Sequence, residues 1–331
     1  MNSEKEQLNY TFSWFDWFCL WYPPGWLILF NRHWQKYHTD PDGWNWLEYI
    51  LFLIPGGFYL ALLIRWLRLG CRSPRPGNSE FNPNYQQAFR QEILAPIAKY
   101  YFRGELHQAE NLPKTVPLII TINHAGMSFP WDFLTLAYLL GETRNWTVKP
   151  LAGVSLFEHP WMMWWLPPGW SKVLGGVRAE IDDFAAAVSQ EIILLYAPEG
   201  VRGPGKGWFS RYQLETFHPS FITLSDRYQI PISPIICFGN EYLHPWTINI
   251  RKLGKIFGLP FLPISFLMPI FALFPSMGIW AMKTRLSYYV QPVCLPQNSA
   301  ATKQSNAYRR AQALKDNMQK QIWELKKYVK N

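Results

Sequence analysis

The sequence is poor in charge. Only 17% of its 331 residues are Asp, Glu, Lys or Arg, against an apolar fraction of 49%. A charged fraction so far below the usual quarter excludes a disordered chain and a long coiled coil, and no internal repeat of about 20 to 50 residues is visible. The chain is therefore expected to fold around apolar cores, and its length suits two domains or one enlarged α/β domain.

The sequence is also poor in cysteine. Cys19, Cys71, Cys237 and Cys294 stand far apart, without a C-x-x-C pair. This spacing excludes a cysteine-based zinc site and a small disulfide scaffold, and it favours a reducing compartment. The opening MNSEKEQLNY lacks the basic start, the apolar run and the small-residue cleavage site of a secretory signal. Any membrane-seeking segment is therefore expected to stay in the mature protein.

Tryptophan and positive charge are present in excess. There are 18 Trp, and 32 Lys and Arg stand against 23 Asp and Glu, which gives a formal net charge of +9. This combination indicates an anionic interface as partner, with a membrane and nucleic acid as the rivals. Nucleic-acid binding would need cations interleaved with aromatic residues on one face, whereas here the cations flank apolar runs. We therefore expect membrane lipids, and no nucleic acid, as partners.

Residues 1–75 are expected to form an aromatic-rich, membrane-associated segment. Seven tryptophans fall within residues 11–46, around the breaker run YPPG at 22–25. An interfacial segment at headgroup depth and a hydrophobic flap packed on the main domain both fit this composition.

A charge-free run of 16 residues lies at 49–64, with Pro55 and two glycines at its middle. A spanning helix needs about 20 apolar residues, so a kinked span and a re-entrant hairpin both remain open. The run is followed by four arginines, namely Arg65, Arg68, Arg72 and Arg75. Such a cluster marks the cytoplasmic side and attracts anionic headgroups. The later chain is therefore expected to face the cytoplasm, after a Pro- and Gly-rich linker at 73–84.

Residues 76–331 change to alternating strand and helix patterns. Runs rich in Ile, Leu and Val predict strands at 102–108, 116–123, 146–152, 191–197, 231–238 and 286–295. Helices are predicted at 85–102, interrupted near Pro96, and near 131–142, 181–190 and 212–228. This alternation predicts an α/β fold with a mixed, mainly parallel sheet covered by helices. Ligands bind beyond the carboxyl ends of the strands in such sheets, so the site is expected in the loops there.

Two further segments stand out in this domain. Residues 257–282 run without a charge but contain four prolines, so we expect an apolar excursion into lipid, with a buried loop as the alternative. The tail at 305–329 repeats apolar residues every three or four positions and carries Lys and Arg on its other face. It predicts an amphipathic helix docked on the core.

His124 is the first candidate catalytic residue. The strand at 116–123 delivers His124 into a loop, after which Asp132 opens a helix. A histidine takes up and returns a proton near neutral pH, and a carboxylate on one ring nitrogen fixes its tautomer. Asp132 is close enough in sequence to serve, although a His near an Asp is more often a structural pair.

A glycine-rich loop after the strand at 191–197 is the second candidate. It reads PEGVRGPGKG and carries one acid, Glu199, and two cations, Arg202 and Lys206. Glycines let the backbone approach a ligand closely, and arginine grips a phosphate through two parallel hydrogen bonds. It is not a Walker A loop, since Gly-Lys is not followed by Ser or Thr. A solvated surface turn is the alternative.

Four blocks of the chain carry a resemblance to a known family. NHAGMSFPWDF at 123–133 and APEGVRG at 197–203 lie on either side of GGVRAEIDDFAAAV at 175–188, and IPISPI follows at 230–235. In order and spacing, these blocks resemble the four motifs of the glycerolipid, or lysophosphatidate-type, acyltransferase superfamily. Its first and third hallmarks read N-H-x4-D and F-P-E-G-T-R.

The resemblance implies a catalytic mechanism and a set of binding residues. His124 would be the general base that deprotonates an acceptor hydroxyl, Asp132 would orient it, and the hydroxyl would attack the donor thioester directly. This chemistry needs one base and charge stabilisation, and no metal or cofactor beyond the acyl donor. The implied substrate-binding residues are Glu199, Gly200, Arg202, Arg178 and Lys206.

The sequence departs from the family's pattern at three places. The family's Asp stands five positions after its His, where Phe129 is found here, so three extra residues must loop out to bring Asp132 back. Ile181 stands where the second motif usually ends in an arginine, so either Arg178 substitutes from another place or the acceptor is not a phosphate monoester. Val201 replaces the threonine of the third motif.

We therefore predict a membrane-bound O-acyltransferase of phospholipid biosynthesis. It would move a fatty acyl group from acyl-CoA or acyl-acyl-carrier-protein to a glycerolipid hydroxyl, in the first place that of 1-acyl-sn-glycerol 3-phosphate. A neutral lipid alcohol, such as diacylglycerol or an isoprenoid alcohol, is the alternative acceptor, and a non-catalytic membrane adaptor is the second alternative. A serine hydrolase is disfavoured because the sequence has no G-x-S-x-G elbow.

Overall fold

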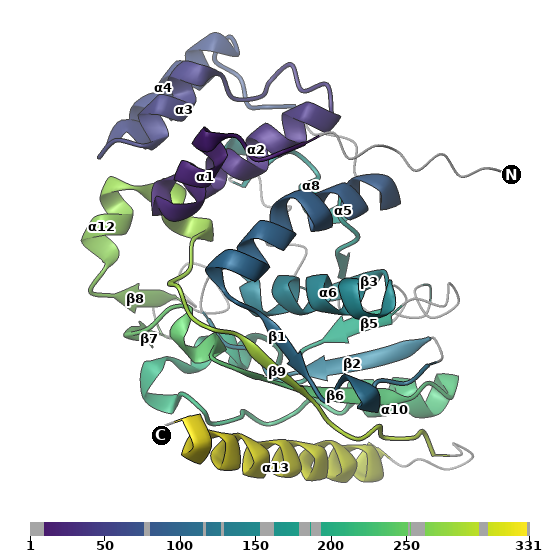
Figure 1. Ribbon diagram of the computed structural model, residues 1–331. Helices are drawn as coiled ribbons and strands as arrows, with labels where there is room; N and C mark the ends of the chain where they lie inside the picture. Colours follow the sequence, from purple (N-terminus) through teal and green to yellow (C-terminus); the bar gives the residue numbers. More distant parts are fainter. Residues whose placement is uncertain are drawn as a thin grey trace, which may run out of the picture. The chain divides into compact units, whose positions relative to one another are not determined.

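The computed structural model describes residues 10–75, 80–114, 117–126, 129–152, 162–178, 186, 193–250, 252, 262–297 and 304–329. The chain divides into two compact units (Figure 1). Unit 1 comprises the described parts of Met1–Tyr101, Val154–Gly176 and Leu267–Trp280. Unit 2 comprises those of Phe102–Gly153, Val177–Phe266 and Ala281–Asn331.

Unit 1 is helical. Its elements are α1 (Trp14–Trp21), η1 (Pro23–Gly25), α2 (Trp26–Tyr37), α3 (Trp46–Phe52), α4 (Gly57–Arg68), α5 (Pro83–Phe89), the π-turns η2 (Arg90–Leu94) and η3 (Ile97–Tyr101), η5 (Met162–Trp164), α8 (Trp170–Val173), α12 (Met268–Leu273) and η10 (Pro275–Ile279). The interruption expected near Pro96 takes the form of these two π-turns.

Unit 1 extends beyond the boundary predicted at residue 75 because later aromatic residues fill its core. Phe30 of α2 packs edge-on against Phe89 of α5 at 5.4 Å and stacks on Trp170 of α8 at 5.1 Å. Leu267–Trp280, within the charge-free run at 257–282, also belongs here, and Gly56 N–H donates to the Leu273 carbonyl at 2.7 Å. Residues 257–261 of that run lie outside the described residues.

The charge-free run at 49–64 forms parts of two short helices. Asn45 caps α3 and exchanges hydrogen bonds with Glu48, and the chain turns at Gly56, whose φ of +73° suits glycine. The stacked rings of Phe52 and Phe58, 5.3 Å apart, join α3 to α4. The structure therefore has a helical hairpin here. Within the described ranges, no helix combines the length and apolarity that crossing a bilayer requires.

Arginines after this run have partners within unit 1. Arg65 is buried and donates to the carbonyls of Trp164 and Asp42, at 2.6 and 2.8 Å. The expectation that it contacts headgroups is therefore wrong, because its guanidinium is enclosed by protein. Arg68 pairs with Glu48 at 2.9 Å, and Arg72 pairs with the Asp42 carboxylate at 2.7 Å. These two arginines, which the sequence predicted to attract lipid headgroups, thus form ion pairs with carboxylates of unit 1.

Unit 2 is built on a seven-stranded sheet. Its strands are β1 (Glu105–His107), β2 (Leu118–Ile122), β3 (Val148–Ala152), β4 (Val177–Arg178), β5 (Ile193–Tyr196), β6 (Ile232–Phe238) and β9 (Ser287–Val290), in the order β1-β9-β6-β2-β5-β3-β4. The five strands from β6 to β4 are parallel, β9 runs antiparallel to β6, and β1 is parallel to β9. The predicted α/β fold with a mixed, mainly parallel sheet is confirmed. All six predicted strands form, and β4 is an addition.

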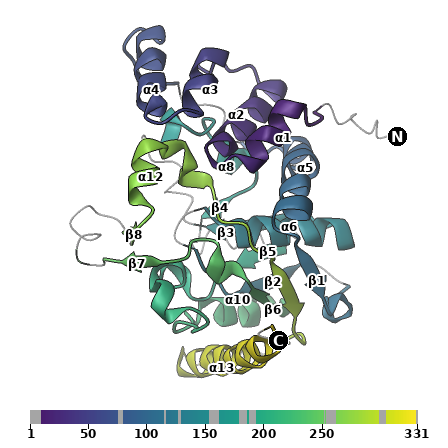
Figure 2. The same cartoon turned by 60° about the vertical axis from the view of Figure 1, so that its left-hand side comes forward.

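Helices cover both faces of this sheet. They are α6 (Trp131–Arg144), α10 (Ser220–Tyr228) and α13 (Gln304–Val329), with α6 on one side and α10 and α13 on the other (Figures 1 and 2). The helix predicted at 212–228 starts only at Ser220, because Tyr212 has a left-handed φ of +66° and a proline precedes the helix. Except for residue 186, the helix predicted at 181–190 lies outside the described residues.

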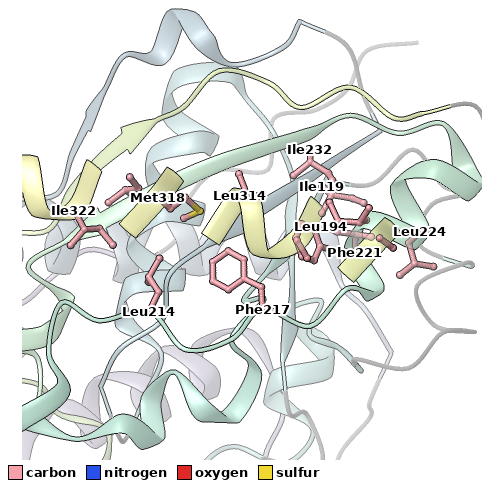
Figure 3. Packing of buried hydrophobic residues seen from close by; sticks show 14 of the residues in the cluster. Ile119, Leu194, Leu214, Phe217, Phe221, Leu224, Ile232, Leu314, Met318 and Ile322 are labelled. Carbon is pink, nitrogen blue, oxygen red and sulfur yellow. The ribbon is translucent and has the colours of Figure 1, made fainter. Parts of the chain in front are cut away.

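The amphipathic tail helix docks on the core as predicted. Ala311, Met318 and Ile322 of α13 are buried, and Figure 3 shows the helix facing Phe217 and Leu214. Burying each large apolar side chain contributes roughly 1.5 to 3 kcal/mol, so this face fastens α13 to the sheet. The strands beneath are covered on both faces, since every residue of β2 and of β6 is buried.

Candidate active site

Three adjacent parallel strands end at the same edge of the sheet and supply the candidate site. β2 pairs with β5 on one side and with β6 on the other. His124 follows β2, Glu199 follows β5, and Asn240 and Glu241 follow β6. Parallel strands present their carboxyl ends together, so loops distant in sequence meet at this edge. All of these residues belong to unit 2.

His124 and Asp132 are in direct contact. His124 Nδ1 lies 2.9 Å from Asp132 Oδ2 and 3.0 Å from Oδ1. The Asp132 side chain is fully buried, whereas that of His124 is 15% exposed. A buried carboxylate on Nδ1 holds the proton there, so Nε2 is the ring nitrogen that can accept a proton from a ligand.

The spacing of eight residues between His124 and Asp132 has a structural explanation. Phe129 stands where the family has its aspartate, and its ring is buried 5.1 Å from that of Trp131. Trp131 N–H donates to the Phe129 carbonyl, which closes a tight turn before α6 begins. This turn takes up the extra residues and places Asp132 in the first turn of α6, where the helix dipole favours a carboxylate.

Polar side chains from two other strands hold this pair in place. Asn123 donates to the Cys237 carbonyl at 2.9 Å and accepts from the Cys237 N–H at 2.7 Å, which ties the end of β2 to β6. Asn240 Nδ2 donates to Asp132 Oδ2 at 3.2 Å, and the Tyr288 hydroxyl donates to the Asp132 carbonyl at 2.8 Å. Asn240 thus contacts the carboxylate that orients the imidazole, whereas Tyr288 holds the backbone of Asp132.

Glu199 is turned inward. Its Oε1 accepts the backbone N–H of His124 at 3.3 Å, and its Oε2 accepts that of Glu215 at 2.8 Å. The residue is almost fully buried. Burial raises the pKa of Glu199 above its usual range, while the neighbouring Lys206 opposes that shift. The carboxylate therefore contacts the loop that carries His124.

Lys206 is buried between two acids. Its side chain is 3% exposed, and Nζ lies 3.1 Å from Glu241 Oε1 and 3.8 Å from Glu199 Oε2. Burial alone would lower the pKa of Lys206, but the two carboxylates outweigh it and hold that pKa above its usual range. Lys206 thus stays charged inside the protein and joins the loops after β5 and β6.

The remaining predicted binding residues differ in how they are placed. Arg202, in η6 (Gly200–Arg202), is exposed and donates to the Thr216 carbonyl at 3.0 Å. Gly200 has a φ of +56°, in the left-handed region that glycine adopts without strain. Arg178 lies in β4 and pairs with Ala152, while its side chain and most of the block at 175–188 lie outside the described residues.

A small hollow opens beside the loop of His124. Ala125, Gly126, Lys206, Trp208 and His244 are among the residues that line it. A side chain at Gly203 would come within 2.8 Å of the His124 carbonyl, so glycine there lets the two loops pack closely.

Sequence reasoning missed Asn240, Glu241 and Tyr288 as parts of this site. A signal was present for the first two, because they directly follow the predicted strand at 231–238. Their relation to His124 depends on β6 lying next to β2, and strand order cannot be read from a single sequence.

Comparison with known proteins agrees with this geometry. Residues 103–238 match the family model described as Acyltransferase. Uncharacterized proteins of Mycobacterium tuberculosis and Mycobacterium bovis are 27% identical over 219 residues, which cover 65% of this chain and 58% of each relative. One of Mycobacterium leprae is 27% identical over 200 residues, covering 57% of this chain and 51% of the relative. The chain thus matches little more than half the length of these relatives.

One solved structure is also similar. The 1-acyl-sn-glycerophosphate acyltransferase PlsC of Thermotoga maritima aligns over 90% of this chain and 95% of its own, with 14% identity and a TM-score of 0.43. The family match covers the strands β1, β2, β3, β5 and β6 together with the loops of His124 and Glu199. All four blocks that carry the motif resemblance lie within the residues that match this family model, so this part of the chain is similar to the Acyltransferase family.

Proposed function

We propose that this protein transfers a fatty acyl group from a thioester donor, acyl-CoA or acyl-acyl-carrier-protein, to the hydroxyl of a glycerolipid at a membrane surface. The observation that carries the proposal is the buried Asp132 carboxylate on His124 Nδ1, at the carboxyl edge of the sheet. This arrangement leaves one ring nitrogen for a substrate proton. No second residue of nucleophilic type is needed, because the acceptor itself is the nucleophile.

The chemistry balances with His124 as the one proton carrier. Nε2 takes the proton of the acceptor hydroxyl while the hydroxyl oxygen bonds to the thioester carbonyl carbon. The tetrahedral intermediate then collapses, the carbon–sulfur bond breaks, and the imidazolium returns its proton to the leaving thiolate. Asp132 stabilises the imidazolium between these steps, as in hydrolase triads.

Unit 1 supports the membrane part of the proposal. Three of its helices expose apolar side chains to solvent, among them Trp14 and Trp21 of α1, Trp46 and Ile50 of α3, and Leu63 and Leu67 of α4. Exposed apolar patches of this extent mark binding surfaces, and tryptophan favours the boundary between headgroups and acyl chains. The hairpin of α3 and α4 is therefore proposed to rest in the interface.

Replacing Arg202 tests which of the two proposed acceptor classes is the substrate. Its exposed guanidinium, beside the loop of His124, can pair with a phosphate monoester, whereas a neutral alcohol offers it no charge. If the acceptor is 1-acylglycerol 3-phosphate, Arg202→Ala should raise the acceptor KM by about 10- to 100-fold, as expected for a lost charge-assisted pair. The donor KM should stay unchanged, and Arg309→Ala, at an exposed arginine of α13, is the control. An unchanged acceptor KM would favour a neutral lipid alcohol.

A panel of labelled donors and acceptors tests the function itself. The full chain is assayed in lipid vesicles with radiolabelled acyl-CoA or acyl-acyl-carrier-protein, and with lysophosphatidate, diacylglycerol or an isoprenoid alcohol as acceptor. We expect labelled ester with at least one acceptor. Label that stays on every donor, or moves only to water, would refute the acyltransfer to lipid.

A further inference from the structure

We propose that a cluster of aromatic side chains on unit 2, four of them exposed, is a second membrane contact, which seats the mouth of the His124 site in the headgroup layer of an anionic bilayer. The cluster consists of Trp208, Phe209, Tyr242, Trp246 and Phe266 and is called the aromatic rim below. The inference rests on the proposed function, because it names the surface from which the lipid acceptor enters.

Four rings of the aromatic rim form one connected group, and Phe209 follows Trp208 in the chain. Trp208 lies 5.5 Å from Tyr242 and 6.1 Å from Trp246, and Trp246 lies 5.1 Å from Phe266, all measured between ring centroids. The small ladder of β7 (Thr247–Asn249) and β8 (Pro263–Ser265), seen in Figure 2, pairs Thr247 with Ser265. Trp246 and Phe266 therefore stand side by side at the same end of the ladder.

Four of the five rings of the rim are exposed to solvent, whereas Trp208 is half-buried. Phe209 is 81% exposed and Phe266 is 66% exposed, and Tyr242 and Trp246 are exposed as well. A packed core explains none of these positions. Contiguous exposed apolar surface on a folded domain marks a place where something binds.

The charges around the rim favour an anionic lipid surface. The guanidinium carbon of Arg211 lies 4.4 Å from the centroid of the Trp208 ring, and the exposed Arg202 lies earlier in the chain, in η6. Glu241, in the same stretch as Tyr242, points inward to Lys206 and presents no negative charge outward. Aromatic rings mixed with arginine are the composition that settles at headgroup depth, where rings reach toward acyl chains and cations meet phosphates.

The rim borders the candidate active site. Trp208 lines the same hollow as Ala125 and Gly126, which directly follow His124. A bilayer held by the rim would therefore present its lipids beside the catalytic loop. An acceptor could then enter without leaving the headgroup layer, which removes the cost of exposing its acyl chain to water.

Depth in the bilayer tests the rim without any enzymatic readout. The full chain, with Cys71→Ser and Cys294→Ser, carries one new cysteine labelled with a polarity-sensitive dye, either Phe209→Cys in the rim or Tyr308→Cys on α13. Tyr308 is a matched control because it is an exposed aromatic residue of the same unit. The vesicles contain phosphatidylglycerol and phosphatidylcholine in equal parts, with brominated acyl chains.

We expect the dye at position 209 to be quenched by the brominated lipid several-fold more than the dye at position 308. Equal quenching at the two positions, or no binding of the protein to the vesicles, would overturn the inference. This outcome is independent of acyl transfer, so it is distinguishable from a failure of the proposed function.

A kinetic comparison tests the consequence for the acceptor. Phe209→Ser combined with Phe266→Ser should lower kcat/KM about tenfold or more for an acceptor held in vesicles, because the free energy of burying two phenyl rings in the bilayer is lost. The value for a short-chain, water-soluble acceptor should not change. Tyr308→Ser combined with Trp323→Ser, two exposed aromatics of α13, is the control. Equal loss on both acceptors, or a loss only with an acyl-carrier-protein donor, would contradict a lipid contact.

Discussion

Replacing His124 by alanine is expected to lower acyl transfer by about 10²- to 10⁴-fold, the range that one general base contributes. The loss follows because Nε2 is the nitrogen left to accept the hydroxyl proton once Nδ1 is engaged by Asp132. The KM values for donor and acceptor should change little, since the imidazole acts on a proton and not on a headgroup. The measurement is the initial rate of labelled ester formation at saturating donor.

The control for this variant is His218→Ala. His218 is an exposed histidine of the same unit, so its removal leaves the charge balance comparable without touching the site. Both variants should unfold at temperatures close to that of the parent protein. If the His124→Ala protein keeps the parent rate, the assignment of the base is wrong.

Replacing Lys206 by methionine is expected to destabilise unit 2 by about 3 to 5 kcal/mol, the usual cost of removing one partner of a buried ion pair. Methionine fills similar volume, but Glu199 and Glu241 would then be buried without their cation. Glu199 also accepts the His124 N–H, so activity should fall together with stability. Denaturant unfolding of the full chain measures the free-energy change.

The pH dependence of that variant distinguishes lost charge from lost packing. Without Lys206, the carboxyl group of Glu199 has a folded-state pKa above the unfolded one, because burial is no longer opposed by that cation. The cost of this buried charge is fully present at high pH and falls as the pH drops toward the unfolded pKa. The variant should therefore differ less from the parent protein at pH 5 than at pH 8. Lys315→Met, at a surface pair with Asp316, should cost only about 0 to 1 kcal/mol at either pH.

The sheet was predictable because parallel strands covered on both faces must be apolar throughout. The runs LIITI of β2 and ISPIICF of β6 are buried at every position and were recognisable on that ground. The contact of His124 with Asp132 could be anticipated only through the family motif, since the spacing alone does not say that Phe129 and Trp131 fold into a turn.

The binding residues were harder to predict because burial depends on tertiary contacts. The sequence indicated that Glu199 and Lys206 are ligand-facing charges in a glycine-rich loop, whereas the structure buries both and places Lys206 between Glu199 and Glu241. Their substrate-binding role stays a prediction. The prediction that Arg65 contacts headgroups was wrong for the same reason. An arginine after an apolar run is typical of a headgroup contact, but here carbonyl groups such as that of Asp42 bind the guanidinium inside the protein.

The division of the chain was also beyond sequence patterning. Trp170 and Leu273 come from segments far along the chain, yet both contact the N-terminal helices of unit 1. Composition marks where apolar residues are abundant, whereas their assignment to one core or another depends on long-range packing.

The most direct test of the account is a double-mutant comparison at the candidate base. Acyl transfer is measured for the parent protein, His124→Ala, Asp132→Asn and the combined variant. If Asp132 acts only by orienting and stabilising the imidazole, the combined variant should be no slower than His124→Ala alone, because groups that act as one unit are not additive. A combined loss equal to the product of the single losses would contradict the account, since the two residues would then act independently.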